Sequence, residues 1–142
     1  MLLSQVSNLL SQRNRVQQNF KNVFLEDKTF EAGNLDNYFL NKLNIIIEAR
    51  YANEEFTVEE LSTEIGLSRS QLHRKLVNLT NHSTTEYIRL YRIKKASELL
   101  LSNQYQVDEI AYRVGFNSPS YFSTCFKNVY DVSPKEYMKT NH

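Results

Sequence analysis

The chain has 142 residues, enough for one ordinary domain or two very small ones. Only three glycines and two prolines interrupt runs rich in leucine, isoleucine, lysine, glutamate and arginine, so we expect an all-α protein. One cysteine excludes an internal disulfide, and no apolar run has the length of a signal sequence or membrane span. We therefore expect a cytoplasmic protein that makes no membrane contact through this segment.

The formal net charge is only +1, but the charge is unevenly distributed along the sequence. Residues 26–64 hold ten acidic and three basic side chains, whereas residues 67–95 hold seven basic side chains and one acidic one. A basic patch of this kind attracts a polyanion such as DNA. Solvated helix faces that bind nothing carry similar runs, so charge alone leaves both interpretations open.

The first 34 residues are predicted to be a separate segment. Apolar residues at a four-three spacing predict one amphipathic helix over residues 2–20, and the loss of this period predicts a linker up to residue 34. The helix is too short for an independent coiled coil. It is either the remnant of a preceding domain or a weak dimerisation helix, and the main domain covers residues 35–142.

A first helix-turn-helix unit is predicted at about residues 57–80, after a helix that begins near Asp36. Thr57 and Glu60 have the spacing of a capping box, Gly66 supplies the turn, and Ser68 begins the second helix. One apolar stripe of that second helix should face inward: Leu72, Leu76 and Leu79.

A long helix follows, from Thr84 to about Leu101, with Ser83 as its cap. Its predicted buried residues are Tyr87, Ile88, Tyr91, Ile93, Ala96, Leu99 and Leu100. At 1.5 Å per residue it would span about 27 Å. Successive major-groove faces on one side of B-DNA lie roughly 34 Å apart. A rigid connector of this length can therefore place two recognition helices one turn of DNA apart.

Residues 107–130 repeat the first unit 49 to 50 positions later. The segment Val107–Phe116 corresponds to Val58–Leu67, and Ser118 with Pro119 starts the second helix of this unit. Ser133 with Pro134 repeats that start signal for a final helix. Two such units on one chain predict a protein that reads two neighbouring segments of DNA, and its site need not be palindromic.

The second helix of each unit is the one expected in the major groove. In the first unit, the exposed positions within two turns of the helix start are Arg69, Ser70, His73 and Arg74. Arg74 is the best candidate for a bidentate contact to guanine, although it can instead hold a phosphate. The second unit offers neutral side chains at its groove face: Pro119, Ser120, Tyr121 and Thr124. We expect that helix to read thymine methyls and groove shape, or to bind less specifically.

Phosphate contacts are expected from basic side chains and from capped helix N-termini, whose backbone N–H groups suit an anion. The predicted set is Lys75, Ser83, Arg89, Arg92, Lys94, Ser118, Lys127 and Ser133. We expect no metal and no cofactor, because the three histidines form no cluster at metal-ligand spacing. Cys125 falls on the inward side of a helix, and no Gly-rich phosphate loop is present, so an enzyme is not expected.

The stretch from Ile110-Ala111-Tyr112-Arg113-Val114-Gly115-Phe116-Asn117-Ser118-Pro119 through Phe126-Lys127 to Ser133-Pro134-Lys135-Glu136-Tyr137 resembles the C-terminal signature of AraC/XylS-type transcription regulators. The similarity covers roughly residues 36–140. It implies seven helices in two subdomains joined by a long helix, and sequence-specific binding of double-stranded DNA that recruits RNA polymerase. Carried over by position, the base-facing residues are Ser70, His73, Arg74, Pro119, Ser120, Tyr121 and Thr124. Some relatives carry a large aromatic or basic residue where Ser70 stands.

The segment Leu9-Leu10-Ser11-Gln12-Arg13-Asn14-Arg15-Val16 is similar to the joint between a receiver domain and this output domain in hybrid two-component sensors of gut Bacteroidetes. This resemblance implies an output module whose phosphorylation occurs on another domain. A homodimer formed through residues 2–20 or through an upstream domain is a separate hypothesis. The alternative function is a helical protein-protein interaction module without specific DNA binding. Strong salt dependence of binding to duplex DNA would separate the two.

Overall fold

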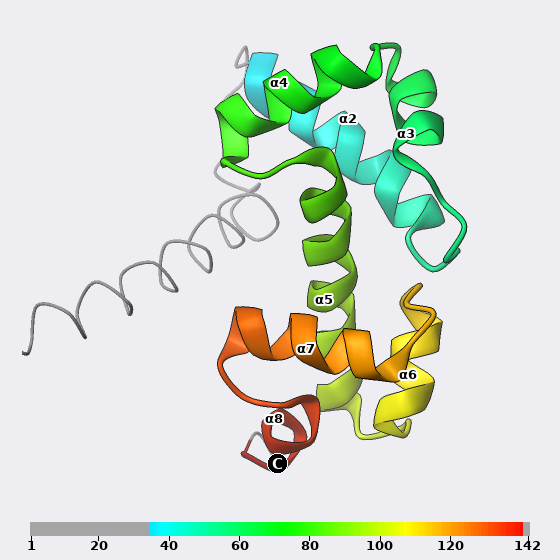
Figure 1. The fold of residues 1–142 in the computed structure, drawn as a ribbon, viewed down its shortest axis with the longest axis vertical. Helices are drawn as coiled ribbons and strands as arrows, with labels where there is room; N and C mark the ends of the chain where they lie inside the picture. The colour runs from blue at the N-terminus through cyan, green and yellow to red at the C-terminus, as the bar shows by residue number, and fades with distance from the viewer. Residues whose placement is uncertain (1–34, 141–142) are drawn as a thin grey trace, which may run out of the picture.

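The computed structural model describes residues 35–140, which form seven α-helices and no strand. In chain order they are α2 (Leu35–Arg50), α3 (Val58–Ile65), α4 (Arg69–Thr80), α5 (Thr84–Ser102), α6 (Val107–Arg113), α7 (Pro119–Tyr130) and α8 (Pro134–Thr140). Figure 1 shows α2, α3 and α4 at one end of α5 and the last three helices at its other end. This confirms the all-α fold with two helix-turn-helix units on a long connecting helix. The helix expected over residues 2–20 lies outside the described residues.

The first unit has the local structure that its capping residues predict. Thr57 Oγ1 accepts from the Glu60 N–H at 3.1 Å, and the Glu60 carboxylate accepts from the Thr57 N–H at 3.2 Å. Ser68 and Gln71 form a second capping box at the start of α4. Between the two helices Gly66 has φ +83°, a left-handed conformation that L side chains rarely adopt.

The second unit repeats the turn of the first. The N–H of Phe116 donates to the Ala111 carbonyl at 3.0 Å, just as the N–H of Leu67 donates to the Ser62 carbonyl at 3.0 Å. Both bonds close six-residue loops of the kind that ends helices with a left-handed residue. Ser118 caps α7 by accepting from the Tyr121 N–H, and Pro119 occupies the first turn.

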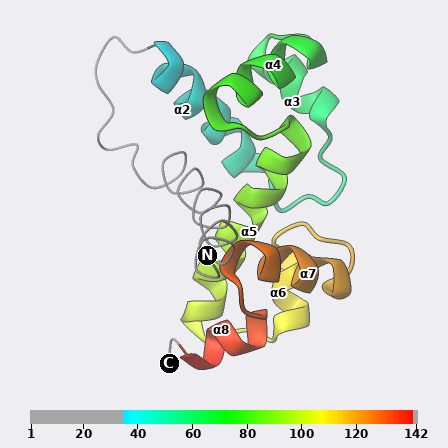
Figure 2. The ribbon, with the colours of Figure 1, turned by 60° about the vertical axis from the view of Figure 1, so that its left-hand side comes forward.

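Helix α5 is buried along much of its length because it contributes to two hydrophobic cores. Tyr87, Ile88 and Tyr91 pack with α2, α3 and α4. The second core, shared with α6 and α7, takes four other apolar residues from α5: Leu90, Ile93, Ala96 and Leu100. The two cores lie one after the other along α5. Figure 2 shows the helices around α5 from a second direction.

Two details of the predicted cores need correction. In α4 the fully inward residue after Leu76 is Thr80 rather than Leu79, which is only partly buried. The Thr80 hydroxyl donates to the Leu76 carbonyl at 2.8 Å, so it is buried without an unpaired polar group. In α5 the prediction omitted Leu90 and counted Leu99 as buried, although Leu99 is partly exposed. A single-stripe pattern cannot describe a helix that faces two cores.

Candidate nucleic-acid interface

Helix α4 presents the predicted base-reading residues of the first unit on one open surface. Arg69, Ser70, His73 and Arg74 are all exposed, and they line one hollow together with Val58 and the start of α5. Three consecutive residues supply that start: Ser83, Thr84 and Thr85. The first N–H groups of a helix lack partners within the helix, and they favour an anion. The hollow therefore joins the predicted base-reading side chains to a helix end that suits a phosphate.

Helix α7 presents the corresponding surface of the second unit. Ser120 and Thr124 are exposed, Pro119 is half-buried, and the Tyr121 side chain is 48% exposed. The Thr124 hydroxyl donates to the Ser120 carbonyl at 3.2 Å, so its proton is used in a hydrogen bond within α7. Figure 1 shows α4 and α7 both crossing the direction of α5, one beyond its N-terminal end and the other over its C-terminal half.

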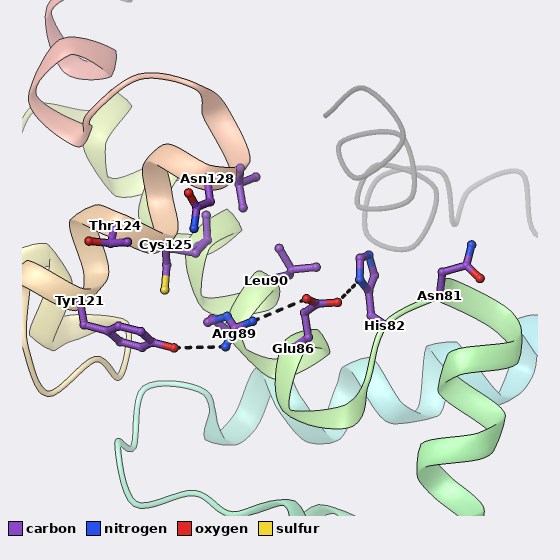
Figure 3. Close-up of a pocket in the computed structure, with 11 residues that line it drawn as sticks. Asn81, His82, Glu86, Arg89, Leu90, Tyr121, Thr124, Cys125 and Asn128 are labelled. Carbon is purple, nitrogen blue, oxygen red and sulfur yellow. Dashed lines mark hydrogen bonds and ion pairs between the residues drawn. The ribbon is translucent and has the colours of Figure 1, made fainter. Parts of the chain in front are cut away.

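A groove runs between α7 and the residues that follow α4, with α5 as its floor (Figure 3). Tyr121 and Thr124 form part of its wall on the α7 side, and Asn81 and His82 form the wall at the end of α4. A chain of polar contacts crosses the floor. Its members are His82, Glu86, Arg89 and Tyr121. Predicted phosphate and base contacts are thus linked within one surface.

Arg89 occupies the centre of this surface. Its Nη1 donates to the Tyr121 hydroxyl at 3.1 Å, and its Nη2 lies 3.6 Å from the Glu86 carboxylate. The Arg89 side chain is 34% exposed and borders a second hollow on the other side of Tyr121. A partly exposed guanidinium between α4 and α7 is well placed to meet a phosphate between two major-groove segments. Arg89 stays a predicted phosphate contact, and its hydrogen bond to Tyr121 helps to orient it.

Arg92 has different neighbours from those that a phosphate contact requires. Its Nε donates to the Tyr51 carbonyl and its Nη2 to the Asn53 carbonyl, both at 2.9 Å. Burial lowers the pKa of this guanidinium, while the charge of Glu54 opposes that shift. Because the donors are directed at backbone carbonyls beyond the end of α2, we withdraw Arg92 from the phosphate set.

Lys94 and Lys75 also face away from this interface. Lys94 lies five positions after Arg89 in α5. At 3.6 residues per turn, the two side chains point about 140° apart around the helix. Lys94 Nζ lies 2.6 Å from Glu98, and the lysine side chain is only 15% exposed. Lys75 Nζ lies 4.9 Å from the centre of the Phe39 ring on α2, outside the hollow that holds Arg74. These two lysines were predicted from sequence charge alone, without their helix faces.

The remaining predicted phosphate contacts are the helix caps and one lysine. Ser83, Ser118 and Ser133 each accept from the N–H three residues ahead, at 3.2, 3.3 and 3.1 Å. Their hydroxyls therefore cap the helices, and it is the neighbouring N–H groups that are available to a phosphate. Lys127 is exposed on α7. All four stay predictions.

The sequence interpretation missed residues that the structure places on the same surface. Thr85 is exposed at the start of α5 and lines both the first hollow and the one beside Arg89. Asn128 lines the groove one helical turn after Thr124. The spacing of Tyr121, Thr124 and Asn128, at three and seven residues, was the signal that could have found the latter.

Within residues 35–140 no group of three or more His, Cys, Asp or Glu side chains could hold a metal ion. No helix in that range is long and apolar enough to cross a membrane. Cys125 is buried in the second core, as its position in α7 predicts.

A family model described as a helix-turn-helix domain matches residues 61–140, more than half of the chain. The chain belongs to the AraC-type helix-turn-helix family. Among curated relatives, the AraC-type domain is 39% identical over 83 residues to the HTH-type transcriptional activator RhaS of Mannheimia succiniciproducens, covering 58% of this chain and 31% of RhaS. It is also 35% identical over 133 residues to histidine kinase P4 of Formosa agariphila, covering 93% of this chain and 10% of the kinase.

Solved structures agree with this assignment. The C-terminal domain of AraT, a response regulator from Geobacillus stearothermophilus, is 31% identical with a TM-score of 0.65, covering 72% of this chain and 84% of that one. The DNA-binding domain of AdpA, a global transcriptional factor solved with a target DNA, is 27% identical with a TM-score of 0.64, covering 70% and 89%. The AraC-type domain spans about a tenth of the kinase and about a third of RhaS.

Proposed function

We propose that this domain binds a specific double-stranded DNA sequence and reads two successive major-groove segments, one with α4 and one with α7. The observation that carries the proposal is that both predicted reading faces are exposed, the α4 face in one hollow and the α7 face in a groove with Arg89 at its floor. A third hollow shares Thr85 with the first and Arg89 and Tyr121 with the groove. The AdpA domain, which has the same fold, was solved in complex with its target DNA. That likeness supports DNA as the occupant of this surface.

The two helices divide the task unequally in this proposal. Helix α4 supplies Arg69, His73 and Arg74, which can donate to base edges, and Arg74 suits guanine O6 and N7. Helix α7 supplies Ser120, Tyr121 and Thr124, which carry no full charge. It reads thymine methyls and groove shape, and contributes less selectivity. The phosphate contacts are Arg89, Lys127 and the N-termini of α5, α7 and α8.

The domain serves transcription in the cytoplasm as the output part of a signalling protein. Support comes from RhaS, named as a transcriptional activator, and from the match to a histidine kinase along almost the whole of this chain. Activation then includes contact with RNA polymerase. Pairing of two copies through residues 2–20 or through an upstream domain is a further part of the proposal, and those residues lie outside the described range.

Selection of bound duplexes from a random DNA library tests the proposal directly. We expect a directional site with one sharply defined block and one softer, A/T-leaning block centred roughly 10 base pairs away. A palindromic site would assign control to one unit in each of two paired chains. Recovery of no enriched sequence would refute specific DNA binding and favour the protein-interaction alternative.

A further inference from the structure

Three segments that are far apart in the sequence meet where the two subdomains touch. They are the residue after α2, Tyr51; the middle of α5, at Arg92; and the turn between α6 and α7, at Gly115. The two bonds from Arg92 to the carbonyls of Tyr51 and Asn53 tie α5 to the loop that leads into α3. Both carbonyls lie just beyond the end of α2, near the negative end of its dipole, so a guanidinium suits them.

Gly115 brings the second unit into the same contact. A Cβ atom on this residue would lie 2.3 Å from the Tyr51 carbonyl oxygen and 2.7 Å from Arg92 Nε. The turn of the second unit therefore lies directly against the arginine and against the carbonyl that it holds. The Tyr51 ring also packs against both hydrophobic cores.

This contact lies close to the reading helix of the second unit and to the first helix of the first unit. Helix α7 begins at Pro119, four residues after Gly115, and α3 begins at Val58, seven residues after Tyr51. Without the contact, the subdomains would be joined mainly through α5, and a long helix can bend. A small shift between Tyr51 and Gly115 would change both the distance and the rotation between α4 and α7.

We propose that Arg92 is a positioning residue that fixes α4 relative to α7 and so makes the domain selective for one spacing between the two blocks of its DNA site. This inference rests on the proposed function. Each inserted base pair moves the second block by about 3.4 Å and rotates it by about 35°. A rigid connection holds α4 and α7 at a fixed separation, so affinity for a site with altered spacing falls. A flexible connection lets the two helices move with the displaced block and keeps the affinity.

The test compares DNA sites of different spacing. Duplexes carry the selected site with one base pair removed, unchanged, or with one or two base pairs inserted between the blocks, and further duplexes carry only the sharper block. Dissociation constants are measured by fluorescence anisotropy for the wild-type chain, Arg92→Gln, Arg92→Lys and the matched control Arg113→Gln. Arg113 is an exposed arginine of α6 whose side chain pairs with Glu109 and lies over the Tyr105 ring, so this control loses the same charge without removing the bonds to Tyr51 and Asn53.

We expect the wild-type chain to prefer the selected spacing by about tenfold or more, a loss comparable to one mismatched base pair. Arg92→Gln should lower that preference to about threefold or less and leave binding to the single block unchanged. Arg92→Lys, which cannot reach both carbonyls with a planar fork, should fall between them. Equal weakening on every duplex, or an unchanged spacing preference in Arg92→Gln, would overturn the positioning role. Failure of the wild-type chain to bind any sequence specifically would instead refute the proposed function.

A second measurement needs no DNA. Spin labels on Asn78→Cys in α4 and Asn128→Cys in α7, both at exposed positions, report the distance between the reading helices in a Cys125→Ser background. We expect a narrow distance distribution for the wild-type and Arg113→Gln chains and a broader one for Arg92→Gln. Circular dichroism checks that each variant folds. If Arg92→Gln does not fold, the comparison is made with Arg92→Lys. Identical distributions in all folded variants would contradict the inference.

Discussion

Arg74 and Arg89 both belong to the proposed interface, but their surroundings suit different contacts. Arg74 is exposed on the reading helix, and no acidic partner is found for it among the described residues. Arg89 lies on the connecting helix and is held by Tyr121 and Glu86. An arginine on a recognition helix with no acidic partner can contact a base edge. An arginine between two such helices, oriented by its neighbours, suits a phosphate of the DNA backbone.

Arg74→Ala should cost roughly 1 to 3 kcal/mol on the selected site and relax the preference at one base pair. The loss arises because a bidentate bond to one base disappears. Binding profiles across all single-base variants of the site measure it. Lys94→Ala is the control, since Lys94 pairs with Glu98 on another face of α5, and it should change nothing. Uniform weakening by Arg74→Ala would reduce Arg74 to a phosphate contact.

Arg89→Ala should weaken binding to all sequences alike and make the slope of log K against log salt less negative by about 0.9, the effect of one phosphate contact. Titrations at several salt concentrations give this slope. Arg113→Ala removes a paired, exposed arginine of α6 and should leave the slope unchanged. A change of base preference in Arg89→Ala, confined to the softer block, would show that its main action is to orient Tyr121.

At the scale of elements, the two turns of the repeat differ in how closely they are packed. Gly66 and Gly115 both have positive φ, +83° and +100°, so alanine is strained at either position. A Cβ at Gly66 would meet nothing within 4 Å, whereas a Cβ at Gly115 would collide with the Tyr51 carbonyl oxygen. Alanine at Gly66 therefore measures backbone strain alone, whereas alanine at Gly115 measures backbone strain together with steric overlap.

Gly66→Ala should lower the free energy of unfolding by about 1 to 2 kcal/mol, the cost of a left-handed alanine. Gly115→Ala should cost about 2 to 5 kcal/mol, because a clash in a packed region adds to that strain. Urea unfolding followed by circular dichroism measures both. Equal costs would mean that α6 and the end of α2 move apart easily, which would also weaken the case for a stiff contact at Arg92.

The elements were predictable from the sequence because capping and turn residues act locally. Thr57 with Glu60, Ser68 with Gln71, and the two turn glycines each determine structure within a few residues. The roles of Arg92 and Lys94 were not predictable in this way, since charge in a sequence does not tell which side of α5 a residue occupies. The partners of Arg92 lie about 40 residues earlier in the chain. Leu90 was missed for the same reason, because α5 faces two cores.

At the scale of the whole molecule, the structure reduces the cationic patch that the sequence suggested. Lys95 pairs with Glu48, Lys94 pairs with Glu98, Lys75 lies over the Phe39 ring and Arg92 binds backbone carbonyls. With Lys127 of α7 added, the proposed phosphate- or base-facing cations are Arg69, Arg74, Arg89 and Lys127. At about 0.9 per neutralised phosphate, four cations predict a slope of log K against log salt near −3.6. A slope shallower than about −1.5 would contradict the nucleic-acid interface. A slope steeper than about −6 would show that Lys75 and Lys94 also contact phosphates.

Helix α5 is at once the last helix of the first half, α2 to α5, and the first helix of the second half, α5 to α8. Neither half retains a complete core without it, since Tyr87 and Tyr91 serve one core while Ile93 and Leu100 serve the other. Melting of either half would expose one side of α5 and remove support from the other half. We therefore expect heat or urea to unfold both halves in a single cooperative transition despite the two cores. The folded domain then binds both DNA segments and the unfolded domain binds neither, with no stable state in which one unit alone binds half of the site.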